Sequence, residues 1–139
     1  MADRKTFSVS VVTPDGPAFE GDVEMIVVPG AAGEIGVLAR HAPLIATLKA
    51  GSTRVHPGGG EVREFATGPG FFQVLQDRAI ALVDDAVDAQ QIDADRANAQ
   101  LEEAKAELAK IEAGDSTVDR WQVEQRIKHA ENQLAVLGR

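Results

Sequence analysis

Apolar and polar side chains alternate along short segments in the first 87 residues, and turn signals such as Asp15-Gly16 and Pro29-Gly30 separate these segments. Alternation with a period of two is typical of β-strands that bury one face. Because the segments are short and no helical period lies between them, they predict an antiparallel β-sandwich or flattened barrel of about ten strands. A parallel sheet would need crossover helices. The clearest strand segments are residues 7–13, 23–28, 61–67, 71–75 and 79–83.

The hydrophobic period becomes helical from Ala89 onward, in a part of the chain that contains no proline. Apolar residues recur there at steps of three and four, which places them on one stripe of a helix. Gly114 can lie just past the end of a first helix, and Ser116 with Asp119 has the spacing of a capping box that opens a second helix. The pattern therefore predicts a β-sandwich over residues 1–87 and an antiparallel helix-turn-helix over residues 88–139. The two predicted stripes are Ala94, Ala97, Leu101, Ala104, Leu108 and Ile111, and Val123, Ile127, Ala130, Leu134 and Leu137.

The first of these stripes consists half of alanine, which buries much less apolar area than leucine. Removing a leucine-sized side chain from water contributes about 1.5 to 3 kcal/mol, and alanine contributes far less. We therefore expect a hairpin of modest stability that can open, or dock elsewhere, at a tolerable free energy.

Composition and charge narrow the classes of function. The chain has 139 residues, of which 44% are hydrophobic and 4% aromatic, so a packed core of aliphatic residues is expected. It has no cysteine, which excludes disulfides and thiolate metal sites, and its three histidines lack ligand spacing. The net charge of -8 disfavours binding to nucleic acid and to anionic lipid headgroups. No apolar run approaches the ~18 residues that span a bilayer, so direct insertion into lipid is not expected.

The most informative motif lies in residues 29–51, where Gly30, Gly33 and Gly36 are followed by His41-Ala42-Pro43-Leu44 and the segment closes at Gly51. This combination resembles the signature of the epsilon subunit family of F-type ATP synthases, and the resemblance covers essentially the whole chain. It implies an N-terminal β-sandwich and a C-terminal helix-turn-helix. It also implies a noncatalytic part of the central rotor that joins the gamma subunit to the c-ring. Such a protein would be peripheral, at the cytoplasmic face of the bacterial plasma membrane.

The resemblance also implies two sets of contact residues. Loops at one end of the sandwich touch the polar loops of the c-ring in this family, and the corresponding positions here are Thr13, Asp15, Glu34 and His41. In bacterial relatives the hairpin can extend into the catalytic head of alpha and beta subunits and block ATP hydrolysis. The cations that would then pair with an acidic segment of the head are Arg120, Arg126 and Lys128.

A nucleotide motif opens the first predicted helix. Ile92, Asp93, Arg96 and Ala97 match the family pattern that binds ATP in some bacterial members. Arg96 can contact phosphate, and Asp93 can accept a hydrogen bond from the nucleoside. The alternative interpretation is structural: Asp93 caps the helix, and Arg96 pairs with Asp93 or Asp95.

Positions on both helices weaken the case for ATP. The arginines of nucleotide-binding relatives align here with Glu103, His129 and Gln133. We therefore expect ATP to be at most a weak regulatory ligand, and we expect no required cofactor and no metal.

Other residues carry no catalytic prediction. The glycine loop lacks the Lys-Ser/Thr of a phosphate loop, and His41 has no nucleophile or acid at a recognisable spacing. The acidic group at residues 84–88 lacks the form of a calcium loop and predicts a solvated hinge. Trp121 either packs under the sandwich or anchors an interface. Two rival classes stay open, a free-standing β-sandwich binding module and a nucleotide-sensing protein; recovery with an ATP synthase complex would discriminate against the first.

Overall fold

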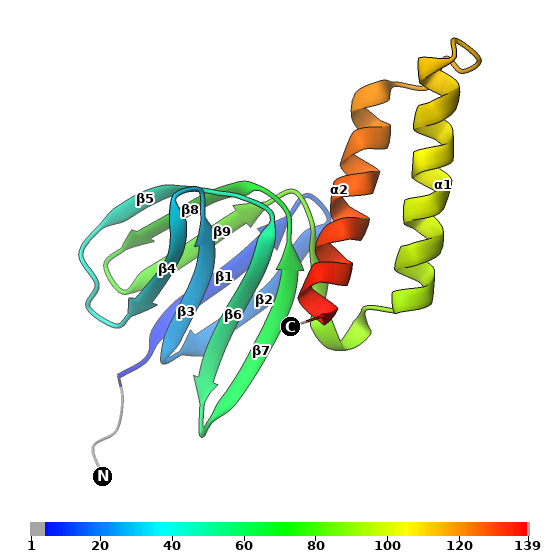
Figure 1. The fold of residues 1–139 in the computed structure, drawn as a ribbon. Coiled ribbons are helices and arrows are strands. Elements are labelled where there is room, and N and C mark those ends of the chain that lie inside the picture. Colours follow the sequence, from blue (N-terminus) through cyan, green and yellow to red (C-terminus); the bar gives the residue numbers. More distant parts are fainter. Residues whose placement is uncertain (1–4, 139) are drawn as a thin grey trace.

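The structure is a computed structural model that describes residues 5–138. A β-sandwich of ten strands is followed by two antiparallel helices that stand beside one edge of it (Figure 1). The fold predicted from the sequence is confirmed. The strands are β1 (Phe7–Thr13), β2 (Gly16–Val23), β3 (Met25–Gly30), β4 (Gly33–Leu38), β5 (Leu44–Leu48), β6 (Gly51–Gly58), β7 (Glu61–Thr67), β8 (Gly70–Leu75), β9 (Arg78–Val83) and β10 (Ala86–Asp88). A 3-10 turn, η1 (Ala89–Gln91), leads into α1 (Ala94–Glu112) and α2 (Arg120–Leu137).

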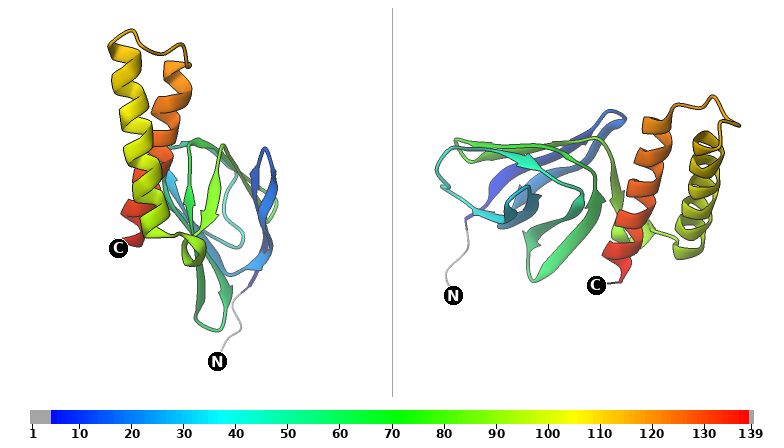
Figure 2. Two further views of the ribbon diagram at one scale, coloured as in Figure 1. Left: turned by 90° about the vertical axis from the view of Figure 1, so that its right-hand side faces the viewer. Right: turned by 45° about the horizontal axis from the view of Figure 1, so that its top comes forward.

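The strands form one sheet in the order β10-β7-β6-β3-β5-β8-β9-β1-β2, with β4 paired to β3. The strands at the two ends of this order, β10 and β2, approach each other, so the sheet is nearly closed (Figure 2). Phe19 of β2 packs edge-on against Phe65 of β7, with ring centroids 6.3 Å apart, and the Arg63 guanidinium lies over both rings. All strand pairs are antiparallel except β1 with β9. These two strands lie far apart in the sequence, so the chain between them provides the return that a parallel pair needs.

The period-two pattern locates the strands well but misplaces one turn. The expected segments 7–13 and 61–67 agree with β1 and β7. The predicted turn at Pro29-Gly30 is wrong, because both residues belong to β3 and the turn lies at Ala31 and Ala32. Pro29 keeps its place at the end of the strand by accepting a hydrogen bond from Lys49 N through its carbonyl oxygen, at 2.9 Å.

The core between the layers is mostly aliphatic, as the composition predicts, but it also contains Phe7, Phe65 and Phe72. Alternation is seen directly on β8, where Phe72 and Val74 are buried and Phe71 and Leu75 are exposed. The largest fully buried side chains include Phe65 and Phe72 together with Ile26, Leu48, Val9, Val11, Val23, Val28, Val37, Val55 and Val74.

The hairpin has defined ends. Asp93 caps α1, and its Oδ1 accepts from Asp95 N at 3.0 Å and Arg96 N at 3.2 Å. Gly114 has φ +79° and lies just past the end of α1, as predicted, next to the C-cap Ala113. Gly114 N donates to Ile111 O, and Asp115 N donates to Lys110 O, which is the hydrogen-bond pattern of a Schellman motif.

The predicted capping box is wrong, because it places the N-cap of α2 at Ser116, three residues too early. The N-cap of α2 is Asp119, whose carboxylate accepts from Trp121 N at 2.9 Å. Ser116 lies earlier, in the connection, where its hydroxyl donates to Glu107 and accepts from Val118 N. The capping-box interpretation takes Asp119 as the third residue after the N-cap. An aspartate is itself a strong N-cap, however, and Asp119 has that role here.

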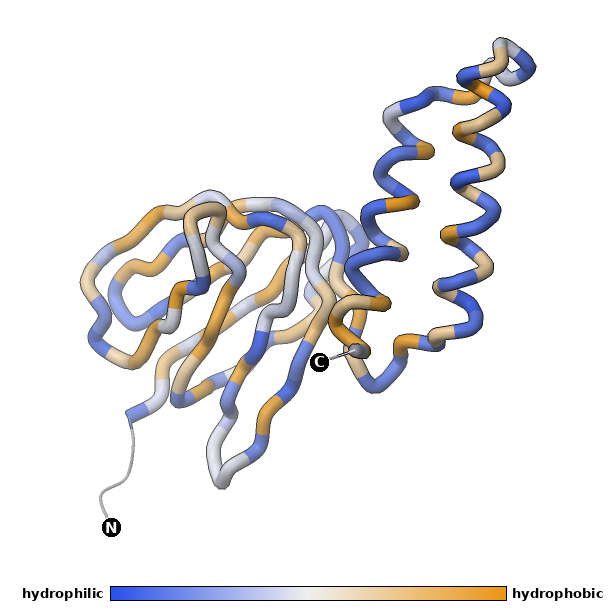
Figure 3. Tube along the Cα trace, viewed as in Figure 1, coloured by the Kyte–Doolittle hydropathy of each residue, from blue (hydrophilic) through white to orange (hydrophobic). Residues whose placement is uncertain are grey.

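The helices face each other through the predicted stripes (Figure 3). On α1 the buried residues are Ala97, Leu101 and Ala104, which is a mostly small surface. On α2 they are Val123 and Ala130 of the predicted stripe, and Val136, which the predicted stripe did not include. The predicted stripes are not buried along their whole length, because Ala94, the first residue of α1, and Leu137, the last residue of α2, are exposed. The sheet itself ends at Asp88, one residue beyond the predicted boundary of the first unit, because β10 pairs with β7.

Candidate interaction surfaces

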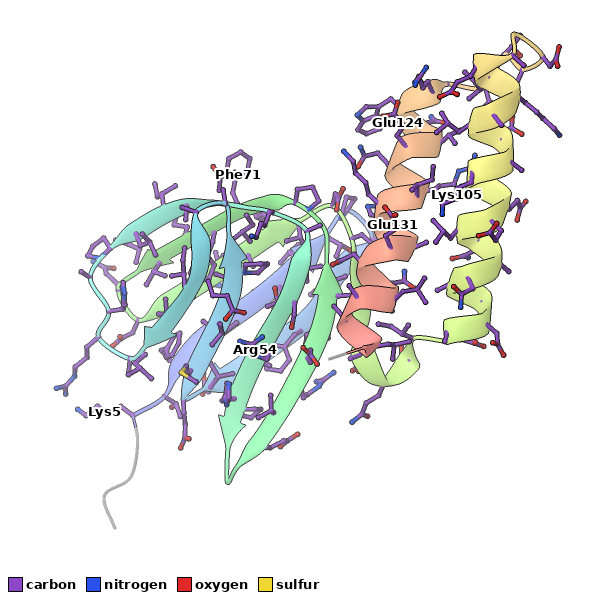
Figure 4. All side chains as sticks on the ribbon, in the orientation of Figure 1. Lys5, Arg54, Phe71, Lys105, Glu124 and Glu131 are labelled. Carbon is purple, nitrogen blue, oxygen red and sulfur yellow. The ribbon has the colours of Figure 1, made fainter. Side chains whose placement is uncertain are left out.

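An exposed apolar face covers β5, β8 and β9 on the outer side of the sandwich. Phe71 lies between Thr47 of β5 and Leu82 of β9 in the strand register. Its side chain points away from the sheet (Figure 4) and is 61% exposed. We call this surface the Phe71 face; its apolar members are Ile45, Phe71, Leu75 and Leu82, exposed by 77, 61, 48 and 53%. A group of large apolar side chains kept in water indicates a docking site for another protein.

Sequence reasoning missed this face, although a signal for it was present. Adjacent aromatic residues on one strand must point to opposite sides of the sheet. Since Phe72 is buried, Phe71 is necessarily on the outer side. The pair Phe71-Phe72 therefore marks an apolar outer surface.

Three of the predicted c-ring residues lie towards one end of the sandwich. Thr13 and Asp15 belong to the tight turn between β1 and β2, where Thr13 Oγ1 accepts from Asp15 N at 3.1 Å and donates to Gly16 O at 3.0 Å. Glu34 lies one residue into β4, and its carboxylate pairs with Arg54 at 3.1 Å. This end of the sheet presents a rigid turn and acidic groups.

The structure does not bring His41 to that end. Its loop is held at the β8–β9 turn, because Arg40 N donates to Asp77 Oδ1 at 2.6 Å. The β1–β9 register places that turn beside the start of β1, whereas the Thr13 turn follows the end of β1. Four further residues of β1 separate the two ends by roughly 13 Å or more. His41 Nδ1 lies 2.7 Å from the carbonyl oxygen of the adjacent residue Ala42.

A pocket of about 310 Å³ lies between the two helices and the hinge. The three positions that depart from the family's arginines, Glu103, His129 and Gln133, all line it. Arg126 contributes the cation, and Asp85 adds a second carboxylate. Two acidic groups against one arginine make this pocket unfavourable for a polyphosphate.

The four residues of the ATP motif are not among those that line this pocket. Asp93 acts as the helix cap, which the structural interpretation predicted. The predicted ion pair of Arg96 with Asp93 or Asp95 does not form among residues 5–138. Arg96 is exposed one turn before the pocket residue Gln100, on the same side of α1. Ile92 ends the turn before α1, and Ala97 belongs to the buried stripe of α1.

The three cations predicted to act in regulation do not form one cluster. Arg120 pairs with Glu112 at 3.2 Å and with Glu124 at 2.9 Å. Arg126 lines the pocket, and Lys128 is exposed. At about 100° per residue, these positions spread around α2 rather than sharing one face. Trp121 is 66% exposed, so it does not pack under the sandwich.

The acidic hinge is engaged with its surroundings rather than solvated throughout. Asp88 pairs with Arg63 at 3.1 Å, and Asp84 lies 3.3 Å from His129 Nε2. Within residues 5–138, His, Asp and Glu side chains form no group of three that could hold a metal ion. In the same range no helix has the length and apolarity to cross a membrane.

The fold defines a small β-sandwich protein with a docked C-terminal helical hairpin. Residues 6–89 match the family model described as ATP synthase, Delta/Epsilon chain, beta-sandwich domain. The chain is 39% identical over 132 residues to the ATP synthase epsilon chain of Bacillus cytotoxicus, covering 95% of this chain and 96% of that one. It is 38% identical to the epsilon chain of Halalkalibacterium halodurans, covering 96% and 98%. The chain therefore belongs to the ATP synthase epsilon chain family.

Solved structures agree with the fold. A chain in the Euglena gracilis mitochondrial ATP synthase structure, which contains OSCP, F1 and the c-ring, superposes with a TM-score of 0.73 at 24% identity. That likeness covers 98% of this chain and 84% of the other. A chain of the Tetrahymena thermophila mitochondrial ATP synthase, from its central stalk and c-ring, gives a TM-score of 0.59 at 12% identity, covering 98% and 99%.

Proposed function

We propose that this chain is a noncatalytic central-stalk subunit that joins the gamma subunit of an F-type ATP synthase to its c-ring. The observation that carries this proposal is the Phe71 face on a closely packed sandwich. A packed sheet resists deformation, so it can transmit torque between two partners that grip different parts of it. The subunit would act peripherally, at the cytoplasmic face of the plasma membrane.

The two partners are assigned by chemistry. The apolar Phe71 face suits gamma, since stable protein interfaces have an apolar core around aromatic anchors. The turn of Thr13 and Asp15, and Glu34 at the start of β4, suit the polar loops of the c-ring. His41, at the other end, would reach the ring only through a different contact, so its predicted role is the weakest of the four.

Assembly tests the proposal directly. The purified chain is mixed with a gamma and c-ring complex that lacks its own epsilon subunit, and binding and ATP-driven proton pumping are measured. Stoichiometric binding with restored coupling supports the proposal. A chain that stays monomeric and unbound would instead support the free-standing binding module.

Gamma binding is expected to survive removal of the hairpin. A chain that ends at Gln91 keeps β10 and the Asp88 pair with Arg63, so the sheet should stay intact. We expect a cooperative thermal transition and an affinity for gamma within about 0.5 kcal/mol of the full chain. Circular dichroism and calorimetric titration measure both. Loss of cooperative folding in the shortened chain would show that the two units are not separable.

The hairpin is proposed to regulate hydrolysis by leaving the sandwich and extending into the alpha and beta head. Its alanine-rich seam supports this, because small side chains bury little area and separate at modest free energy. In the extended state Val123, Ile127 and Leu134 would pack on the new partner. Arg126 and Lys128 would be available to acidic groups there, while Arg120 would first have to leave Glu112.

ATP binding to the free chain is expected to be weak or absent. Arg96 supplies one charge-assisted contact, but Glu103 and Asp85 place negative charge in the neighbouring pocket. Each missing arginine contact contributes about 1.5 to 3 kcal/mol, so losing two lowers affinity at least about a hundredfold.

Calorimetric titration with ATP checks this expectation. We expect His129→Arg with Gln133→Arg to strengthen binding, and Arg96→Ala to abolish whatever binding exists. The control is Asn98→Ala, an exposed position on α1, which should leave the titration unchanged. Micromolar binding by the unmodified chain would contradict the proposal and indicate that Arg126 takes the missing role.

A further inference from the structure

One side chain joins the hairpin to the main chain of the sandwich. Asn132 of α2 donates through Nδ2 to the carbonyl oxygens of Thr67 at 3.0 Å and Gly51 at 3.3 Å. Gly51 and Thr67 are directly paired at the junction of β6 and β7. Because both partners are carbonyl oxygens, only the amide nitrogen of Asn132 satisfies them.

The acceptor side of this contact belongs to a buried polar network. Thr67 is fully buried, and its hydroxyl lies 2.8 Å from that of the equally buried Thr53. Thr67 Oγ1 also lies 3.5 Å from Gly51 O. Asn132 therefore meets the sheet at a fixed point, where the positions of the acceptors are set by the core.

The remaining polar contacts across this junction are more exposed. His129 Nε2 lies 3.3 Å from Asp84 Oδ2, and Nδ1 lies 4.0 Å from Asp85 Oδ2, with side chains 29 to 40% exposed. Solvent screens such pairs, so they contribute little. Helix α2 lies against β6 and β7, and α1 lies on the side of α2 that faces away from the sandwich (Figures 1 and 2).

We propose that Asn132 is the latch that fixes the docked position of the hairpin, and that the docking equilibrium depends on its amide. A carboxylate of nearly the same shape and volume would face the two carbonyl oxygens with no proton to donate, so docking would be weakened without a loss of packing. This proposal rests on the hairpin mobility proposed above and names the contact that controls it.

The docking equilibrium can be measured on the full, free chain. The sequence contains no cysteine, so two spin labels can be placed at Glu61→Cys and Lys110→Cys, exposed positions on β7 and α1. In the labelled chain that keeps Asn132, the distribution of distances between the two labels should show one dominant docked population. Asn132→Asp is expected to raise the longer-distance fraction at least tenfold, since it removes two hydrogen bonds and adds repulsion.

Two further variants keep the result interpretable. Asn98→Asp makes the same chemical change at an exposed α1 position and should leave the distribution unchanged. His129→Gln should shift it less than Asn132→Asp. Circular dichroism should show unchanged helix content in all three variants.

Equal distributions for Asn132→Asp and Asn98→Asp would overturn the latch. So would a His129→Gln shift as large as that of Asn132→Asp. Because this measurement uses the free chain, it can fail while gamma binding succeeds, and the proposed stalk role can fail while the latch holds.

Discussion

Gly70→Ala is expected to destabilise the sandwich by about 3 kcal/mol or more, an effect of overpacking against main chain. Gly70 begins β8, where it pairs with Val83 of β9 and Leu48 of β5. A Cβ at this position would lie 1.8 Å from Leu82 O and 2.8 Å from Val83 Cα. Both neighbours are backbone atoms of β9, which is paired on its other side with β1, so β9 would have to move away from β8.

The midpoint of urea unfolding, followed by circular dichroism, measures this loss. Gly36→Ala is the matched control, because Gly36 also lies in a strand and a Cβ there meets nothing within 4 Å. That variant should be neutral or stabilised by up to about 1 kcal/mol. Equal midpoints for Gly70→Ala and the unmodified chain would show that the β8–β9 contact can relax.

The glycines of the signature segment illustrate what a motif reveals. Three glycines at regular spacing suggest one common backbone requirement, but the structure separates them. Gly33 has φ +142°, a conformation that other residues rarely adopt. Gly30 has close neighbours instead, because a Cβ there would lie 2.6 Å from Gly33 O. Gly36 is exposed and has neither constraint in this chain, so its place in the motif has no structural explanation here.

Local pattern and long-range register differ in what they reveal. Strand positions, helix stripes and the Gly114 cap follow from neighbours within a few residues, and they were predictable. The pairing of β1 with β9 depends on residues about seventy positions apart, and it decides that His41 and Thr13 lie at opposite ends. The contact of Asn132 with Gly51 and Thr67 likewise joins remote segments, and an asparagine on a helix gives no sign of it in sequence.

The Phe71 face provides the sharpest test of assembly, because its side chains are already in water in the free chain. Phe71 is 61% exposed, so replacing it removes little packing within the subunit. In a complex, an aromatic side chain near the centre of an apolar interface contributes more than its neighbours. Leu82 lies opposite it on β9, and Ile45 lies on β5 two residues from Thr47, the residue opposite Phe71, so both would help to exclude water from the contact.

Phe71→Asp is therefore expected to weaken binding to gamma by about 2 to 4 kcal/mol, which is roughly thirty- to a thousandfold in Kd. Thermal unfolding of the free chain should change little. Val62→Asp introduces the same charge at an apolar residue of β7 that is 47% exposed and lies outside the Phe71 face, and it should bind normally. Calorimetric titration with gamma compares the two variants directly. Normal binding by Phe71→Asp would move the gamma contact to another surface, whereas equal losses in both variants would indicate a general effect of added negative charge on a chain that already carries -8.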